Sequence, residues 1–413
     1  MQLKRVVITG MGAVSPYGKG GDLLFEAMAS GKSGISRHEE LEQFSGLGPR
    51  VAGIVKNIDM MEVPRKHRRS MSPMSVYALL ATQEAVAQSG LSGETLRNGR
   101  TGLIMGSTMG SVHTIEDFFR SYLTRGNLDQ IKSMMFFRVM GHSVAANVAQ
   151  ALGITGRVIA PTAACSTSCQ AIGLAWEAIA LGRQDVILCG GADEYHPLTT
   201  GTFDLMLAAS ATYNDTPERT PRPFDRDRDG TVCSEGAGVL VLESLESALE
   251  RGADILGEVA GFSSTCDASS IANPDPEPLY RCMREALELA GVAPEEISYV
   301  NAHATATVQG DIAEGRAIAM LVGGKAPVSS LKGHMGHTMA ASGALESVAC
   351  VQMLRRQVLL PTLNLEHPDP ECGAVDFLRV NSERPVSVIV KNNFALGGIN
   401  CSLVLRVYEG NTE

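Results

Sequence analysis

The stretch CSEGAGVLVLE (residues 233–243) is the main basis for the fold that we predict, because a second stretch near the C-terminus has the same sequence pattern. That second stretch is ALGGINCSLVLRV (residues 395–407). In each of them a glycine-rich turn leads directly into an apolar strand. One such unit lies in the middle of the chain and the other near its end. The repetition indicates two similar halves that join near residue 250.

Strand-like and helix-like patterns alternate along the rest of the chain. Strands are expected within residues 4–16, 101–107, 184–193, 255–262, 297–305 and 386–394, and helices within 74–90 and 277–292. Strands that alternate with helices predict an α/β architecture with largely buried sheets. With 413 residues, the chain is long enough to form two core-building units.

Composition narrows the possible functions. The chain is 44% hydrophobic and 19% charged, which is typical of globular proteins. It has no opening apolar run and no stretch of about 20 apolar residues, so we expect neither export nor a membrane span, and we expect a cytoplasmic location. Nine cysteines without paired spacing argue against a disulfide framework or a cysteine-rich metal site. The formal net charge of −10 argues against nucleic-acid binding.

A cysteine stands where an apolar helix of small residues is expected to begin, in PTAACSTSCQAIGLAWEAIALG (residues 161–182). Cys165 is either a small buried residue that fills space or a nucleophile. The dipole and the free N–H groups of a helix N-terminus favour a thiolate and can lower its pKa to about 3.5–7.5. Cys169, one turn later, is expected to serve packing.

Histidines in the second half could partner such a cysteine. His303 follows an expected strand in YVNAHATATVQGDIAEG (residues 299–315), a place where α/β proteins often build sites. Lys332, His334 and His337 lie in a glycine-rich loop, LKGHMGH (residues 331–337). Zinc is the rival interpretation of two close histidines, but no further ligands are placed around them.

A calcium loop is the other metal site to consider. DRDRDGTVCSEG (residues 225–236) imitates the opening of an EF-hand loop, but its last ligand position falls on Gly236 and no helix pair flanks it. We therefore interpret it as a charged turn and predict no metal site.

Taken in order, TAACSTS, NAHATAT, LKGHMGH and NNFALGGIN strongly resemble motifs of the β-ketoacyl-acyl-carrier-protein synthases of types I and II. RVVITGMGAVSP, YNDTPERTPRPFDRDRDG and SEGAGVLVLE extend the resemblance over essentially the whole chain. It implies a thiolase-like fold of two duplicated αβαβα halves, which we place at residues 1–250 and 251–413, and a homodimer. A heterodimer with a related subunit is the alternative.

The resemblance also implies the site and its chemistry. Its catalytic members would be Cys165, His303, His337, Lys332, Glu314, Glu346 and Leu396. Cys165 would take an acyl group from a carrier-protein thioester, and the two histidines would assist decarboxylation of a malonyl thioester and stabilise its enolate. Lys332 would hold the loop, paired with Glu346, while Glu314 would help to order the site. The backbone N–H groups of Cys165 and Leu396 would form an oxyanion hole.

Substrate contacts follow from the same resemblance. Thr305 and Thr307 would contact the phosphopantetheine arm, which arrives on the acyl carrier protein, so that no free cofactor is expected. Phe203 and Met109 would line the acyl pocket. The basic run PRKHRR (residues 64–69) is either a solvated loop or, through Lys66 and Arg69, a dock for an acidic carrier protein.

The chain departs from the family at the entrance to the site. Leu396 and Thr231 stand where the family has phenylalanines, and HATAT (residues 303–307) replaces the usual His-Gly-Thr pattern. Both missing aromatics would border the site, so unsaturated, cyclic or oxygenated acyl chains are predicted to load faster than saturated ones. The alternative is that neighbouring side chains refill the space.

Three other functions compete with condensation. A non-catalytic or weakly active partner subunit of a ketosynthase pair would be expected to lack the cysteine. A degradative thiolase would need a second cysteine late in the chain, such as Cys401, and a Cys–His hydrolase would hydrolyse thioesters. The pair of histidines favours condensation, in fatty-acid or in specialised lipid or polyketide synthesis.

Overall fold

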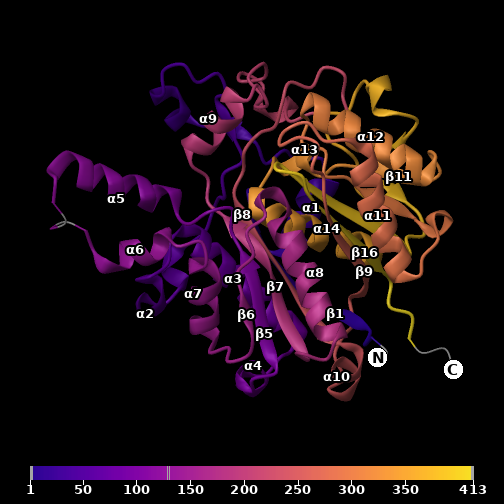
Figure 1. Cartoon of the computed structure of the whole chain (residues 1–413), viewed down its shortest axis with the longest axis horizontal. Helices are drawn as coiled ribbons and strands as arrows, with labels where there is room; N and C mark the ends of the chain where they lie inside the picture. The colour runs from indigo at the N-terminus through magenta and orange to yellow at the C-terminus, as the bar shows by residue number, and fades with distance from the viewer. Residues whose placement is uncertain (1–2, 128, 130, 411–413) are drawn as a thin grey trace.

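The computed structural model describes residues 3–127, 129 and 131–410. In this part of the chain a mixed sheet of twelve strands forms the centre of the fold (Figure 1). From edge to edge the strands are β13 (Asp376–Phe377), β11 (Pro327–Ser329), β10 (Tyr299–Asn301), β15 (Val388–Ala395), β16 (Ile399–Arg406), β9 (Gly257–Cys266), β1 (Val6–Ser15), β8 (Gly236–Ser244), β7 (Val186–Asp193), β5 (Thr101–Gly106) and β6 (Val158–Ile159), while β2 (Gly18–Lys19) pairs with β1.

The order of the strands repeats on the two sides of the sheet centre. Strands β1, β8, β7, β5 and β6 on one side correspond to β9, β16, β15, β10 and β11 on the other. In both sets the first two pairings are antiparallel and the next two are parallel. The two sets join where β1 runs antiparallel to β9, with Val6 opposite Val259. The predicted α/β fold with two related halves is thus confirmed, and the repeated stretches become the equivalent strands β8 and β16.

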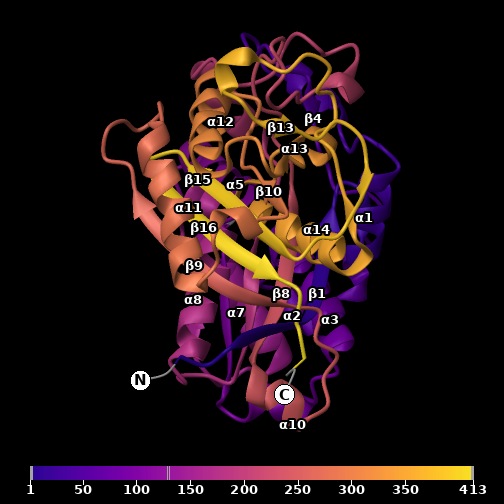
Figure 2. The ribbon, with the colours of Figure 1, turned by 90° about the vertical axis from the view of Figure 1, so that its right-hand side faces the viewer.

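Helices cover the sheet in layers. On the outer face of the first half lie α3 (Pro73–Ser89) and α7 (Ser143–Leu152), and on that of the second half lie α11 (Pro276–Ala290) and α12 (Val308–Val322). The central layer contains α8 (Thr167–Ala180) and α14 (Ser342–Arg356), with α1 (Gly21–Ala29) against α14. Figure 2 shows α11 and α14 on opposite sides of β15 and β16.

Local sequence explains these elements. Helix α11 begins where the Asp275 side chain accepts a hydrogen bond from the N–H of Glu277, and it ends at Gly291, whose φ is 64°. Five of its apolar side chains are buried, and the three large ones, Leu279, Met283 and Leu287, contribute about 1.5–3 kcal/mol each. Glycine lets the two central helices meet, because a Cβ on Gly343 of α14 would lie 2.5 Å from the N atom of Cys169.

Further strands and α-helices complete the described part of the chain. They are β3 (Ser36–Arg37), β4 (Val51–Ala52), β12 (Val358–Leu359), β14 (Ser382–Glu383), α2 (Arg65–Arg68), α4 (Gly93–Arg97), α5 (Val112–Arg125), α6 (Ser133–Val139), α9 (Pro197–Leu205), α10 (Leu245–Glu250) and α13 (Lys332–Met335). Helices α5 and α6 project from the body as an arm (Figure 1). Among the helices formed by described residues, none has both the length and the apolar character that crossing a bilayer requires.

Candidate active site

Cys165 lies in a tight turn at the start of α8. The turn is the 3₁₀ helix η3 (Ala164–Ser166), and Ala164 within it has a φ of 45°. The Ser166 Oγ lies 2.9 Å from the carbonyl oxygens of both Asn393 and Ile399, which share its single proton. These bonds fix the turn against β15 and β16. The nucleophile candidate of the first half is therefore held by strands of the second.

His337 reaches Cys165 from the second half of the chain. Its Nε2 lies 2.9 Å from the Cys165 Sγ, a hydrogen-bonding distance for this pair. The backbone N–H of His337 donates to the carbonyl oxygen of Val232 at 2.8 Å, and His337 forms an isolated bridge with Cys233. These backbone contacts hold His337 against the segment that leads into β8.

His303 completes the group. It follows β10, and its ring centroid lies 5.3 Å from that of His337, at an interplanar angle of 82°. The three side chains bring one ligand-type atom each within 4.8 Å of the others, a spacing that a metal ion could use as well as a reacting thioester. All three side chains are buried. The structure therefore brings together the three residues expected to perform the chemistry.

The expectation of a lowered Cys165 pKa is wrong for this structure. Burial raises the pKa of the thiol to about 11. The charge of Lys332 and the backbone N–H groups of Leu396 and Cys165 lower this pKa, but they offset only part of the effect of burial. Desolvation disfavours the thiolate more than the start of α8 favours it. The thiol therefore keeps its proton at neutral pH until a base such as His337 accepts it.

Both histidines are neutral. Burial, followed by the positive charge of Lys332, lowers the pKa of His303 and of His337 well below the ordinary value. A neutral imidazole can donate one hydrogen bond and accept another. The pair can therefore stabilise a developing oxyanion without first losing a proton.

Glu314 orders the loop that carries His303. Its carboxylate, on α12, accepts hydrogen bonds from the N–H groups of His303 at 2.7 Å and Ala304 at 2.6 Å. Burial raises the pKa of Glu314 to about 7, although these two hydrogen bonds and the nearby Lys332 charge each lower it. Asp311, on the same helix, accepts a bond of 3.1 Å from the N–H of Ala306, whose φ is 70°. The two carboxylates fix the loop after β10.

A buried ionic cluster lies under the histidines. Lys332 Nζ donates to Glu346 Oε1 at 2.6 Å, as the sequence led us to expect for this pair. Lys391 Nζ donates to Glu346 Oε2 at 2.7 Å, and the side chains of all three residues are fully buried. Burial lowers the pKa of Lys332, although its partner Glu346 opposes this. One carboxylate therefore serves two lysines.

Lys391 and Asn393 lie beside the site but were not predicted from the sequence. Both lie in β15, within the run VIVKNNFA (residues 388–395), which we assigned only as a strand. A lysine and two asparagines in an otherwise apolar, fully buried strand were the available signal, because buried charges and amides require partners.

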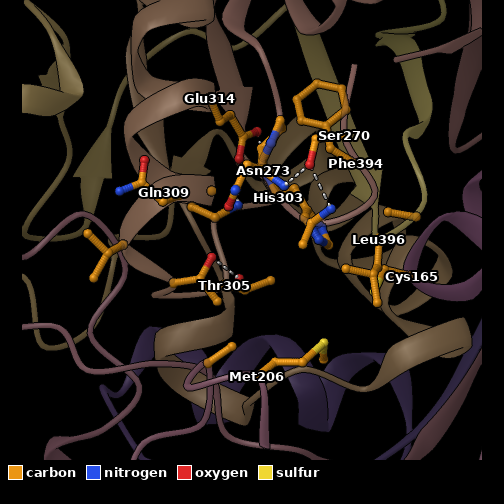
Figure 3. A pocket seen from close by; sticks show the side chains of 18 of the residues that line it. Cys165, Met206, Ser270, Asn273, His303, Thr305, Gln309, Glu314, Phe394 and Leu396 are labelled. Atoms are coloured by element: carbon orange, nitrogen blue, oxygen red, sulfur yellow. Dashed lines mark hydrogen bonds between the residues drawn. The ribbon is translucent and has the colours of Figure 1, made fainter. Parts of the chain in front are cut away.

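Two cavities meet at Cys165. The first, of about 250 Å³, has a lining that includes Cys165, His303, His337, Leu396, Thr305 and Thr307. Figure 3 shows Thr305 across the pocket from Cys165 and Leu396. The second, of about 210 Å³, is lined by Cys165, Phe203, Leu396, Met109 and Tyr195, among others. Cys165, Phe203, Met206 and Leu396 belong to both. A chain attached to the sulfur could therefore extend into the second cavity while another group enters by the first.

The proposed entrance residues have different positions. Leu396 is 42% exposed in the turn between β15 and β16 and lines both cavities. Thr231 is only 1% exposed and is not among the described residues that line either cavity, although its neighbour Gly230 lines the first. Its hydroxyl has no hydrogen-bond partner among the described residues. Leu396, rather than Thr231, is therefore in direct reach of a substrate.

The remaining predicted contacts are at the surface or near it. Thr305 and Thr307 hydroxyls lie 3.1 Å apart on the wall of the first cavity. Met109 is 49% exposed and lines the second. Lys66, on α2, and Arg69, which caps it, are exposed.

Two models of one known protein family match the chain. Residues 3–248 match the family model "Beta-ketoacyl synthase, N-terminal domain", and residues 256–366 match "Beta-ketoacyl synthase, C-terminal domain". The chain belongs to the β-ketoacyl synthase family. Membership favours acyl transfer over metal binding as the role of the converging cysteine and histidines.

Individual β-ketoacyl synthases resemble the chain over its whole length. The 3-oxoacyl-[acyl-carrier-protein] synthase 1 of Escherichia coli K12 is 36% identical over 408 residues, which cover 98% of this chain and 99% of that protein. A crystal structure of a β-ketoacyl synthase from Burkholderia phymatum has a TM-score of 0.95 and 40% identity, and covers 98% of this chain and 100% of that one.

A third similar protein is a ketosynthase solved with its carrier protein. It is described as a type II polyketide synthase acyl-carrier protein in complex with its ketosynthase bound to the hexaketide, with a TM-score of 0.90 and 31% identity over 98% of this chain and 100% of that one. These likenesses confirm the thiolase-like fold and the resemblance seen in the sequence. They include a 3-oxoacyl-[acyl-carrier-protein] synthase and the ketosynthase of a type II polyketide synthase.

Proposed function

We propose that the protein is a β-ketoacyl-acyl-carrier-protein synthase that joins an acyl group held on Cys165 to a malonyl group delivered by a carrier protein. The observation that carries this proposal is the position of Cys165, where the two cavities meet, with His337 Nε2 at 2.9 Å from its sulfur. A covalent acyl intermediate needs one space for the attached chain and another for the second substrate.

The first half-reaction loads the cysteine. His337 takes the thiol proton and the Cys165 sulfur attacks the thioester carbonyl. The carbon–sulfur bond to the carrier's arm then breaks, and the leaving thiolate takes the proton back from His337, which becomes neutral again. The backbone N–H groups of Leu396 and Cys165 lower the pKa of the Cys165 thiol, which supports their assignment as the oxyanion hole for the attacked carbonyl.

The second half-reaction uses the histidines. The carboxylate of the malonyl group leaves as carbon dioxide, and its bonding electrons form an enolate whose oxygen receives hydrogen bonds from His303 and His337. The enolate carbon attacks the acyl carbonyl on Cys165, and the sulfur leaves as a thiolate. Glu314 and Glu346 hold this arrangement through their hydrogen bonds, and burial together with the positive charge of Lys332 keeps both imidazoles neutral.

Substrates are proposed to arrive on an acidic carrier protein. Its phosphopantetheine arm would enter the first cavity beside Thr305 and Thr307, and no free cofactor takes part. The exposed Lys66 and Arg69 supply positive charge on a chain with a net charge of −10. The acyl chain would occupy the second cavity, beside Phe203 and Met109.

A homodimer is the proposed assembly, with a heterodimer of related subunits as the alternative. The α5–α6 arm supports association, because its exposed apolar side chains include Phe119, Tyr122, Leu123 and Phe136. We further propose the division into halves at residues 1–250 and 251–413, which the family matches at 3–248 and 256–366 support. A cytoplasmic location is proposed because all nine cysteines are free.

The other functions fit the site less well. A non-catalytic partner subunit has no use for a cysteine placed against a neutral histidine. Cys401, the second cysteine that a thiolase would need, is buried in β16 and is not among the described residues that line the two cavities.

One assay tests the proposal against its rivals. The protein is incubated with an acyl-carrier thioester and malonyl-carrier protein, and the products are identified by mass spectrometry. We expect a β-ketoacyl-carrier product and carbon dioxide in equal amounts. Free fatty acid without carbon dioxide would indicate a hydrolase, and unchanged substrates would contradict the proposed activity.

A further inference from the structure

Strand β15 carries an unusual set of polar side chains into the core. Lys391, Asn392 and Asn393 are all fully buried. Successive residues of a strand point to opposite faces of its sheet. The side chains of Lys391 and Asn393 accordingly meet next to α14 and Cys165, whereas that of Asn392 contacts Ser402 and Met283.

Lys391 fixes the orientation of the Asn393 amide. Its Nζ donates to Glu346 Oε2 at 2.7 Å, to the Asn392 carbonyl oxygen at 2.8 Å and to Asn393 Oδ1. An ammonium group has three protons and accepts no hydrogen bond, so all three of its donors are used here. The amide oxygen of Asn393 must therefore face Lys391, because the reverse orientation would place donors against donors.

The other end of the same amide faces the active site. Asn393 Nδ2 lies 3.3 Å from His303 Nδ1, 3.1 Å from the Cys165 carbonyl oxygen and 3.0 Å from Ser342 Oγ. Among the described side chains, Asn393 is the one that forms a hydrogen bond with the His303 ring. Because Nδ2 can only donate, a hydrogen bond between it and the ring requires His303 Nδ1 to accept. A neutral His303 then carries its proton on Nε2. His303 lines the first cavity, and Nε2 is its ring nitrogen that remains available to a substrate there.

We propose that Lys391 and Asn393 are positioning residues that hold His303 as the neutral tautomer with its Nε2–H directed at the substrate. The inference rests on the proposed function and identifies what prepares one of its two enolate-stabilising donors. The opposite tautomer would present a lone pair to the developing negative charge and would repel it. The contacts run from Glu346 through Lys391 and Asn393 to the ring.

The substitution Asn393→Asp tests this arrangement with little change of volume. A carboxylate at residue 393 accepts hydrogen bonds only, so His303 would carry its proton on Nδ1 and turn a lone pair toward the substrate. We expect the kcat of malonyl-carrier decarboxylation at pH 8 to fall about 100-fold. The KM should change little, because the carrier and its arm bind elsewhere.

The pH profile distinguishes this role from a structural one. A carboxylate beside the ring raises the pKa of His303, and a protonated ring has N–H groups on both nitrogens. The Asn393→Asp variant should therefore recover much of its decarboxylation as the pH falls from 8 toward 5.5, whereas the wild-type rate should not rise. The other groups that face His303 are Lys332, Lys391, His337 and Glu314. They are the same in both proteins, so protonation of Glu314, whose pKa is about 7, should affect both profiles alike. Profiles that run parallel for the two proteins would overturn the inference.

Two further variants keep the test decisive. Lys391→Met removes the group that orients the Asn393 amide and should lower the kcat of decarboxylation about tenfold. An unchanged kcat would contradict the positioning role of Lys391. If Asn393→Asp does not fold, the result for Lys391→Met tests the inference in its place. Asn392→Ser removes the neighbouring buried amide and should lower the melting temperature without changing the pH profile. Wild-type protein that neither decarboxylates nor condenses would instead contradict the proposed function.

Discussion

The two central helices begin alike but contribute differently to the site. Helix α8 follows η3 with Ala164 at a φ of 45°, and α14 follows a second 3₁₀ turn, η6 (Met339–Ala341), with Met339 at a φ of 50°. Both are non-glycine residues in a conformation that costs roughly 1–3 kcal/mol. The first turn presents Cys165. The second uses the N–H of Ala340 to bind Asp193 Oδ2 at 2.8 Å, and carries no nucleophile.

The difference shows that the backbone was duplicated but the chemistry was not. The first half supplies covalent chemistry through Cys165. The second half supplies neutral donors, His303 and His337, and the charges of Lys332 and Glu346 that surround them. Loading of an acyl group and decarboxylation of a malonyl group should therefore respond differently to substitutions in the two halves.

The largest expected effect comes from removing the nucleophile. Cys165→Ala should reduce condensation by a factor of about 10⁴ or more, because no other group can carry the acyl chain. Malonyl decarboxylation should continue, since His303 and His337 remain. Headspace carbon dioxide and product mass would be measured together, and condensation at the wild-type rate would contradict the division between the halves.

Removing either histidine should have the next largest effect. His303→Ala should slow decarboxylation about 100-fold or more and leave acyl loading nearly intact, because His303 stabilises only the enolate. His337→Ala should slow both steps, since its Nε2 contacts the sulfur. His334→Asn is the matched control, because the buried His334 ring binds the Pro361 carbonyl oxygen instead. Equal losses in both steps for the two alanine variants would contradict separate roles.

The two halves should also respond differently to pH. Burial holds the pKa of both histidines well below the ordinary value, so their ionisation should not change decarboxylation between about pH 6 and 8. A fall toward pH 6 should instead follow protonation of Glu314, whose pKa burial raises to about 7. Burial raises the pKa of Cys165 to about 11, so the thiolate fraction, and with it alkylation by iodoacetamide, should rise about tenfold per pH unit over the same range. An alkylation rate that levels off near pH 6 would show a lowered thiol pKa instead.

Much of this comparison could be predicted from the sequence. The paired glycine-rich turns predicted equivalent strands, and the helices expected at residues 74–90 and 277–292 are α3 at 73–89 and α11 at 276–290. Short motifs around Cys165, His303 and His337 marked residues that the structure brings together. Such motifs are readable because each lies in a few consecutive residues.

Other features depend on contacts between distant segments. The Cys165 pKa was predicted from the helix start alone, but its value is set by burial under strands of the other half. Lys391 and Asn393 were missed because their importance comes from Glu346 and His303, which lie 45 and 90 residues away along the chain. The exclusion of Thr231 from the lining of the cavities likewise follows from packing that no local pattern reports.

A smaller effect is expected at the surface of the first half. Replacing Lys66 and Arg69 together by glutamate should raise the KM for carrier-bound substrates about tenfold and weaken its dependence on salt. The kinetics with small pantetheine thioesters should not change, because these enter without docking. Arg284→Glu, an exposed change on the distant α11, serves as the control. Equal losses with both kinds of substrate would indicate damage to the site.

The smallest effect concerns the entrance beside Cys165. Leu396→Phe adds an aromatic ring at a residue that lines both cavities, and it should shift preference toward saturated chains by a factor of about 3–10. Thr231→Phe should change this preference less, since Thr231 does not line the two cavities. The comparison uses kcat/KM for saturated and polyunsaturated acyl-carrier substrates of equal length. A wild-type preference for saturated chains that Leu396→Phe leaves unchanged would contradict the role of this entrance.

Covalent loading of Cys165 is the central claim, and intact mass spectrometry tests it most directly. The protein is incubated with a panel of acyl-carrier thioesters without malonyl substrate, then digested to locate the added mass. We predict one acyl group per chain, on the peptide that contains Cys165, and none on the Cys165→Ala variant. An acyl group on another residue, or condensation by a protein that never carries one, would contradict the account.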